Sequence, residues 1–374
     1  MTPLLTVTGD GTFCAPTPAD AERLGLPEDP HLAALMRLRA LLGDDLEDQI
    51  ATRLYLPSAL GLDETDHLLP ATLALLAETT GDLVSYGWRL GAGTGRAWQH
   101  ARELRERMLD AARIAWLGYE GPVVTTSLGP ATLSGATFLQ SGERTLADRG
   151  AVRDLPFLLA EGLVGHLTAL RERVPGGQQR VLLREDAVAA VHEGRIPTPS
   201  GRRRYDPVPA PEIGALWRSL YVALEDYGID AREVTLGVGA DIDLLRAARD
   251  AGARRMAIAP RRLPALSTPR GKILWEGIAQ AAEDGCALDI VIDPRPGGRA
   301  LPELEAMLET WRRLGHSATD AAGVSLIAHT GAANDVHAGH VDPSAQPETS
   351  TLLDEAALEA MLRAAPAWAE RVAG

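Results

Sequence analysis

The chain has 374 residues, of which 45% are hydrophobic and 24% charged, and its formal net charge is -14. A chain of this length and composition can bury a large core without disulfides, and it suits one α/β barrel. The acidic balance argues against the basic face that DNA or RNA binding needs, so no nucleic acid is expected as a partner.

The cysteines and the apolar runs indicate a cytoplasmic protein. Cys14 and Cys286 are the only cysteines and belong to no metal-binding cluster, so a disulfide framework is not expected. Residues 1–9 lack the charged and apolar regions of a secretion signal. No uncharged apolar run approaches about 18 residues, and we therefore expect no membrane partner.

Short β-type runs alternate with amphipathic helical stretches along the chain. We expect strands at 4–8, 83–86, 123–126, 180–183, 233–238, 256–258, 288–292 and 324–327. Helical spacing predicts helices at 98–116, 147–173, 213–227, 241–251, 272–284, 301–314 and 351–371, and residues 17–80 are expected as an N-terminal helical insertion.

This alternation predicts the fold class. Parallel neighbouring strands need crossover connections, so strands alternating with helices indicate a parallel sheet. Eight such units favour a closed (β/α)₈ TIM barrel, and an open doubly wound sheet is the alternative. No clean linker divides the sequence, and one barrel domain is expected over residues 1–374.

Polar residues at the carboxyl ends of the predicted strands are the site candidates, because TIM barrels place their chemistry there. Arg261 and Arg262 follow the sixth strand, and Asp293 follows the seventh. We predict Arg261 and Asp293 as ligand-binding residues.

Histidines and acidic residues gather after the eighth strand. His329, Asp335, His337, His340 and Asp342 fall within fourteen residues. Imidazole and carboxylate groups can bind a divalent metal, which makes His329, His337 and His340 an alternative metal site. Their spacing matches no helical pair of ligands, and a solvated polar loop is the other interpretation.

Several motifs occur in an order seen in one family. The run 127–133 reads SLGPATL, residues 148–151 read DRGA, residues 181–186 read VLLRED, and residues 194–198 read GRIPT. Residues 8–12, TGDGT, match a further turn. The chain thereby resembles the catalytic domain of cobalamin-independent methionine synthases, in particular the short actinobacterial-type members, and the resemblance implies a UROD/methionine-synthase-like barrel.

The resemblance also suggests site residues. Glu185 aligns with a functional glutamate of that family, so we predict that it is catalytic. Arg184 and Asp186 stand where the family has Asp and Pro, and Gly11 and Thr12 lie in the first-strand turn. We predict that these four residues bind ligand.

The zinc ligands of that family are missing. The family holds zinc with His and Cys two residues apart after the fifth strand, and these positions are Gly237 and Gly239 here. The family's Cys after the eighth strand is also absent from 328–331, which reads AHTG. Zinc activates a thiol by lowering its pKa, so without ligands this chemistry fails. We expect no zinc and predict no other cofactor.

The sequence therefore predicts a methionine-synthase-like barrel that has lost zinc-dependent methyl transfer to homocysteine and binds a small polar ligand at its mouth. Three alternatives remain open. They are an active methyltransferase with a rearranged site, a non-catalytic partner protein on the same barrel, and a metal-dependent lyase or hydrolase that uses His329, His337 and His340.

Overall fold

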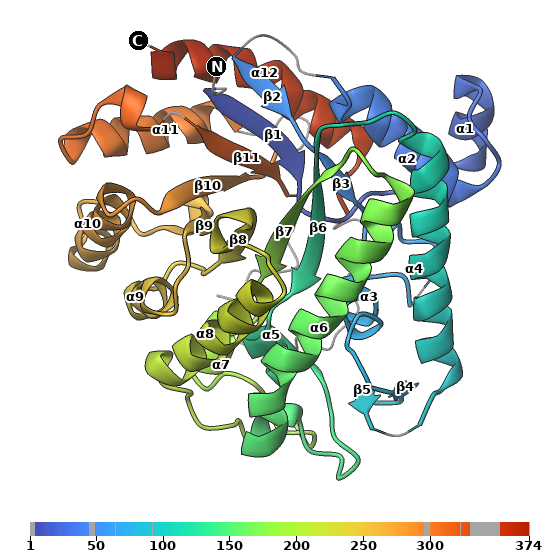
Figure 1. Cartoon of the computed structure of the whole chain (residues 1–374). Coiled ribbons are helices and arrows are strands. Elements are labelled where there is room, and N and C mark those ends of the chain that lie inside the picture. Colours follow the sequence, from blue (N-terminus) through green and yellow to red (C-terminus); the bar gives the residue numbers. More distant parts are fainter. Residues whose placement is uncertain are drawn as a thin grey trace.

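The architecture was taken from a computed structural model, which describes residues 4–373 except 45–48, 64, 92, 295–299, 322 and 330–351. One parallel sheet runs through the described residues, and helices surround it (Figure 1). Its strands are β1 (Leu5–Gly9), β2 (Ile50–Thr52), β3 (Leu54–Leu56), β6 (Pro122–Leu128), β7 (Gln178–Arg184), β8 (Val234–Gly237), β9 (Arg255–Ile258), β10 (Ala287–Ile292) and β11 (Val324–Ala328).

The sheet closes on itself at residue 53. Its hydrogen-bonded order is β2-β1-β11-β10-β9-β8-β7-β6-β3, so β2 and β3 are the two ends. Only Arg53 separates these two strands in the chain. Leu5 pairs with Ile50 on one side, and Leu54 pairs with Val123 on the other. Residues 50–56 thus act as one barrel strand, which makes the sheet an eight-strand barrel and confirms the predicted fold class.

Helices follow the strands and cover the outside of the barrel (Figure 1). Side-chain caps explain several of their starts: Thr17, Asp148 and Asp241 each accept a hydrogen bond from the first turn. The helices are α1 (Pro18–Leu24), α2 (Pro30–Leu42), α3 (Leu68–Leu73), α4 (Arg96–Ala115), α5 (Pro130–Ala136), α6 (Arg149–Arg173), α7 (Val188–His192), α8 (Ala210–Asp226), α9 (Ile242–Asp250), α10 (Pro269–Glu283), α11 (Ala300–Arg313) and α12 (Glu355–Ala373).

The prediction of the second barrel strand at residues 83–86 was wrong. Residues 83–86 lie in an antiparallel hairpin of β4 (Gly81–Val84) and β5 (Gly87–Leu90), which is separate from the barrel sheet. The true second strand, 50–56, falls inside the stretch that was expected to be a helical insertion at 17–80. That stretch carries α1, α2 and α3 as well, but it supplies part of the barrel wall. A single domain over 1–374 stays a prediction.

No helix in the described part of the chain has the length and apolarity that a bilayer span requires.

Candidate functional site

A cavity of about 130 Å³ opens where the barrel strands end. Apolar side chains from several strands line it, namely Leu182, Ala257, Val291 and Ile327. Its polar lining comes from segments at the carboxyl ends of strands: Asp10, Arg184, Glu185, Asp186, Glu193, Asp241, Arg262, Arg270 and His329. An apolar wall with a few charged groups is typical of small-molecule sites.

Asp10 and His329 form the most buried polar pair on this cavity. Asp10 follows β1, His329 follows β11, and the two strands are parallel neighbours. The His329 Nδ1 atom lies 2.5 Å from Asp10 Oδ2. The two residues are 2% and 7% exposed. A carboxylate at Nδ1 holds that nitrogen protonated, which leaves Nε2 as the proton-accepting atom of the ring.

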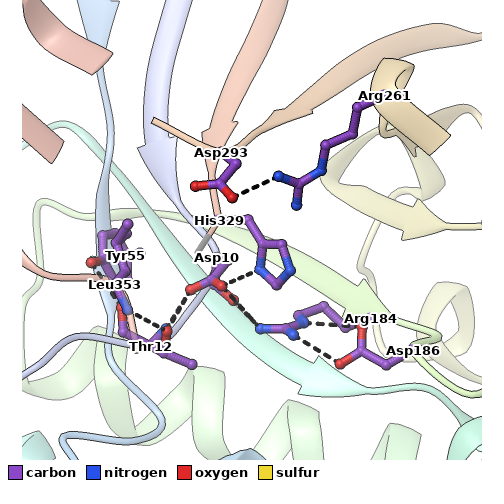
Figure 2. A network of polar contacts seen from close by, with 9 residues as sticks. All are labelled: Asp10, Thr12, Tyr55, Arg184, Asp186, Arg261, Asp293, His329 and Leu353. Atoms are coloured by element: carbon purple, nitrogen blue, oxygen red, sulfur yellow. Dashed lines mark hydrogen bonds and ion pairs between the residues drawn. The ribbon is translucent and has the colours of Figure 1, made fainter. Parts of the chain in front are cut away.

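Arg184 bridges Asp10 to Asp186, as Figure 2 shows. Its Nη1 atom lies 3.2 Å from Asp10 Oδ2, and its Nη2 atom lies 2.8 Å from Asp186 Oδ2. The Arg184 Nε atom donates to Asp186 Oδ1 at 3.3 Å. The Arg184 guanidinium therefore contacts two carboxylates, and these contacts hold Asp10 in position.

The charge state of Asp10 follows from these contacts. Burial opposes ionisation of the carboxyl group, but the Arg184 charge and the hydrogen bond to His329 outweigh it and hold the pKa of Asp10 below its ordinary value. Thr12 contributes through two hydrogen bonds to Asp10 Oδ1, from its backbone N at 2.9 Å and its Oγ1 at 2.8 Å. Asp10 is thus an anion that contacts both Arg184 and His329.

Gly11 and Thr12 shape the first-strand turn. The Thr12 hydroxyl also accepts from the Leu353 backbone N, and Tyr55 donates to the Thr12 carbonyl oxygen (Figure 2). Gly11 has φ +90°, and a Cβ there would lie 2.2 Å from the Thr126 side chain. Neither Gly11 nor Thr12 is among the described residues that line the cavity, so direct ligand binding by them stays a prediction.

The Glu185 carboxylate is hydrogen bonded within the fold. Its Oε1 accepts from the Ala131 backbone N at 3.1 Å and from Trp217 Nε1 at 2.7 Å. Its Oε2 accepts from the Thr132 backbone N at 2.7 Å. Burial raises the pKa of Glu185 despite these contacts. The carboxylate joins the start of α5 to α8 at the end of β7, while its catalytic role stays a prediction.

Arg261 and Asp293 form a separate pair. The Arg261 Nη1 atom lies 2.7 Å from Asp293 Oδ2, and Figure 2 shows no contact from this pair to Asp10 or Arg184. Arg262, next in the chain, lines the cavity, whereas Arg261 does not. The structure therefore brings Arg184, Glu185, Asp186 and His329 to one cavity, and it leaves Arg261 and Asp293 beside it.

The predicted metal alternative cannot be followed in full, because His337 and His340 lie outside the described residues. Another group within the described chain has metal-binding geometry. His192, Asp241 and Asp243 each offer a ligand atom within 4.8 Å of the others. The His192 Nδ1 atom lies 2.8 Å from the Val208 carbonyl oxygen. Asp241 also lines the mouth cavity.

The positions of the missing zinc ligands are on the cavity as well. Gly237 and Gly239 both line it and present only backbone there. Cys286 is buried at the start of β10, and neither it nor Cys14 lines the cavity. The donor set for a thiolate-type zinc site is therefore not found on this cavity wall among the described residues.

The sequence reasoning missed Asp10. The residue lies between Gly9 and Gly11 in the turn that was singled out, but only its neighbours Gly11 and Thr12 were proposed. An acidic residue directly after the first strand of a predicted barrel was the available signal.

No protein family and no curated protein matches the sequence. Among solved structures, the carboxyl transferase domain of Rhizobium etli pyruvate carboxylase is 15% identical with a TM-score of 0.29, over 71% of this chain and 44% of that one. The same domain with 3-bromopyruvate gives 14% identity and a TM-score of 0.28 over the same shares. This chain spans less than half of those proteins, and likenesses of this size say nothing about its function.

Proposed function

We propose that this chain binds a small polar ligand in the mouth cavity and that His329 exchanges a proton with that ligand. The observation that carries the proposal is the 2.5 Å contact between His329 and Asp10 beside the cavity. Asp10 fixes the ring and its tautomer, and its negative charge stabilises the imidazolium that forms when Nε2 accepts a proton. Arg184 and Thr12 hold Asp10 in place for this task.

The wall chemistry supports a ligand with both an apolar and a charged part. The apolar side chains Leu182, Ala257 and Ile327 suit a short hydrocarbon portion. Arg262 and Arg270 bring positive charge to the cavity, and Asp241, whose Oδ2 atom lies 3.9 Å from Arg270 Nη2, brings negative charge. A small zwitterion or organic acid fits this combination.

We propose in addition that zinc-dependent methyl transfer to homocysteine is lost. Gly237 and Gly239 support this part of the proposal, because glycine has no side chain that could bind zinc. Zinc can activate the thiol of homocysteine only where protein ligands hold the metal ion. The test is an assay of methyl transfer from methyl-folate to homocysteine, together with the zinc content of the purified protein. Turnover with stoichiometric zinc would contradict the proposed loss.

Two variants separate ligand binding from proton exchange. Ala240 lines the cavity, and A240F should obstruct it and abolish the thermal stabilisation by amino acids and small organic acids. H329N keeps a side chain that can hydrogen bond to Asp10 but removes the ring base. We expect H329N to bind the same compounds and to lose catalysis of hydrogen exchange at their acidic C–H positions. Unchanged exchange in H329N would contradict the role of His329.

A metal-dependent lyase or hydrolase is the second candidate, and the convergence of His192, Asp241 and Asp243 is the observation that favours it. Titration with Mn²⁺ and Zn²⁺ tests this candidate. Binding that D243N weakens, with D250N as a control on the same helix α9, would support it. Binding of neither ion would remove it.

A further inference from the structure

A second cavity lies apart from the mouth, between the barrel wall and the helices outside it. It has a volume of about 40 Å³. Thr125 and Thr126 of β6 line it on the barrel side, and Arg105 of α4 and His166 of α6 line it on the helix side. The loop before α3 contributes Asp66 and His67. The layer between sheet and helices is normally apolar, so this concentration of polar side chains is unusual.

Several buried polar atoms on this cavity have no hydrogen-bond partner among the described residues. These atoms are His31 Nδ1, His67 Nε2, Arg105 Nε, Thr125 Oγ1, Thr126 Oγ1 and His166 Nδ1. Thr125, Thr126 and His166 are 2%, 1% and 6% exposed. A buried polar group without a partner costs about five- to hundredfold in the folding equilibrium. Together, several such groups would cancel much of the free energy of unfolding of an ordinary domain.

The donor and acceptor types around the cavity define what can satisfy these atoms. Arg105 Nε can only donate, a neutral imidazole offers one acceptor nitrogen, and each threonine hydroxyl can do both. A molecule that both donates and accepts hydrogen bonds therefore fits the cavity. A volume of about 40 Å³ admits only a few non-hydrogen atoms.

The charge of the cavity points to a neutral occupant. Burial lowers the pKa of His67 to about 4 and that of His166 to about 3, so both imidazoles are uncharged at neutral pH. Burial also lowers the pKa of His31, the third histidine on the lining. The other titratable groups on the lining are Asp66 and Arg105, and the Arg105 Nη2 atom already lies 3.0 Å from Glu106 Oε1. Burial raises the pKa of Asp66, whose Oδ2 accepts from the backbone N atoms of Leu60 and Leu62. An added ion would therefore lack a matching countercharge.

We propose that this cavity is a second binding site, which takes a small uncharged molecule that donates and accepts hydrogen bonds. Water is the smallest such molecule, and a small amide or diol is the other source of the same chemistry. The site is distinct from the mouth cavity, because the two cavities have no lining residue in common within the described chain.

The sign of one isosteric substitution tests the proposal. In T125V a methyl group replaces a hydroxyl of nearly the same size. If a bound molecule satisfies this hydroxyl, the variant loses a hydrogen bond, and its unfolding equilibrium constant in urea rises about fivefold. If the cavity is dry, the variant loses an unsatisfied group, and the same constant falls. A fall would overturn the proposal.

A calibration variant and a direct measurement complete the test. T137V removes a buried hydroxyl that is hydrogen bonded to the Leu133 carbonyl oxygen and to Thr145 Oγ1, so it calibrates the loss of a satisfied group. Magnetic relaxation dispersion of water counts long-lived internal waters in the wild type and in T125V. Fewer such waters in T125V assign the site to water, and thermal stabilisation of the wild type alone by acetamide or ethylene glycol assigns it to a solute. Stabilisation by Zn²⁺ or phosphate that T125V abolishes would overturn the neutral-ligand proposal.

Discussion

His329 and Asp10 are joined through their side chains at the point where the last described strand meets the first. Gly9 pairs with Ala328 in the register of β1 and β11, and the residues that follow each of them make the 2.5 Å contact. Strand register therefore sets this geometry, and no flexible loop has to supply it. Such a contact fixes the imidazole before any ligand arrives.

The first prediction concerns Asp10. D10N removes the charge that faces both Arg184 and His329, and we expect proton exchange by His329 to fall about a hundredfold or more. Breaking a buried ion pair should also lower the free energy of unfolding by about 3 kcal/mol in urea titrations. D186N is the matched control, because Asp186 contacts Arg184 from a more exposed position. Equal losses in both variants would contradict a special role for Asp10.

Glu185 gives the second prediction. Glutamine offers one oxygen and one N–H group to a site that presents only N–H donors, from Ala131, Thr132 and Trp217. E185Q should therefore lose about 2–3 kcal/mol of unfolding free energy. Chemical denaturation measures the loss, and ligand binding by the folded fraction is measured beside it. Unchanged stability with lost activity would instead favour the catalytic role that the family resemblance implies.

The third prediction concerns the first-strand turn. Gly11 has φ +90°, and an added Cβ would collide with Thr126, so G11A combines backbone strain with overpacking. We expect it to lower the unfolding free energy by about 2–4 kcal/mol. Gly228 has φ +84° with open space around it, and G228A should cost only about 1 kcal/mol. Similar values for the two variants would show that the contact with Thr126 is unimportant.

Acid sensitivity is the fourth prediction. The pKa values of His67 and His166 are depressed to about 4 and about 3 in the folded protein. Between about pH 6.5 and those values, the unfolded chain binds protons that the folded chain does not. Stability should therefore fall on acidification, by up to about 1.4 kcal/mol per pH unit for each histidine.

Urea titrations at pH 7, 6 and 5 measure this slope. H166Q should reduce it, because the glutamine side chain does not titrate in this pH range. A slope that is the same in the wild type and in H166Q would show that His166 is not the group responsible.

Most of the barrel could be predicted from the sequence, because buried parallel strands are short apolar runs between amphipathic helices. The second strand could not. Residues 50–56, IATRLYL, carry an arginine at their centre, and the apolar run at 83–86 matches the strand pattern equally well. Only the pairing of β2 with β1 and of β3 with β6 decides between them.

The site was predictable in location more than in detail. The rule that strand ends carry the chemistry singled out Arg184, Asp186 and His329, and these three residues line one cavity. The partners of these side chains depend on barrel register, and no spacing in the sequence reveals that Arg184 contacts Asp10. The N–H donors around Glu185 come from α5 and α8, so their convergence is a property of the folded chain alone.

The parallel pairing of β1 with β11 has a consequence for biosynthesis. Leu5 leaves the ribosome long before its partner Val324 is translated. Until then, the edges of β1 and β10 that pair with β11 are both open, and unpaired strand edges promote aggregation. Premature termination before β11 would leave these edges exposed permanently. The truncated chain could not close its barrel, and we expect cellular quality control to recognise it as misfolded.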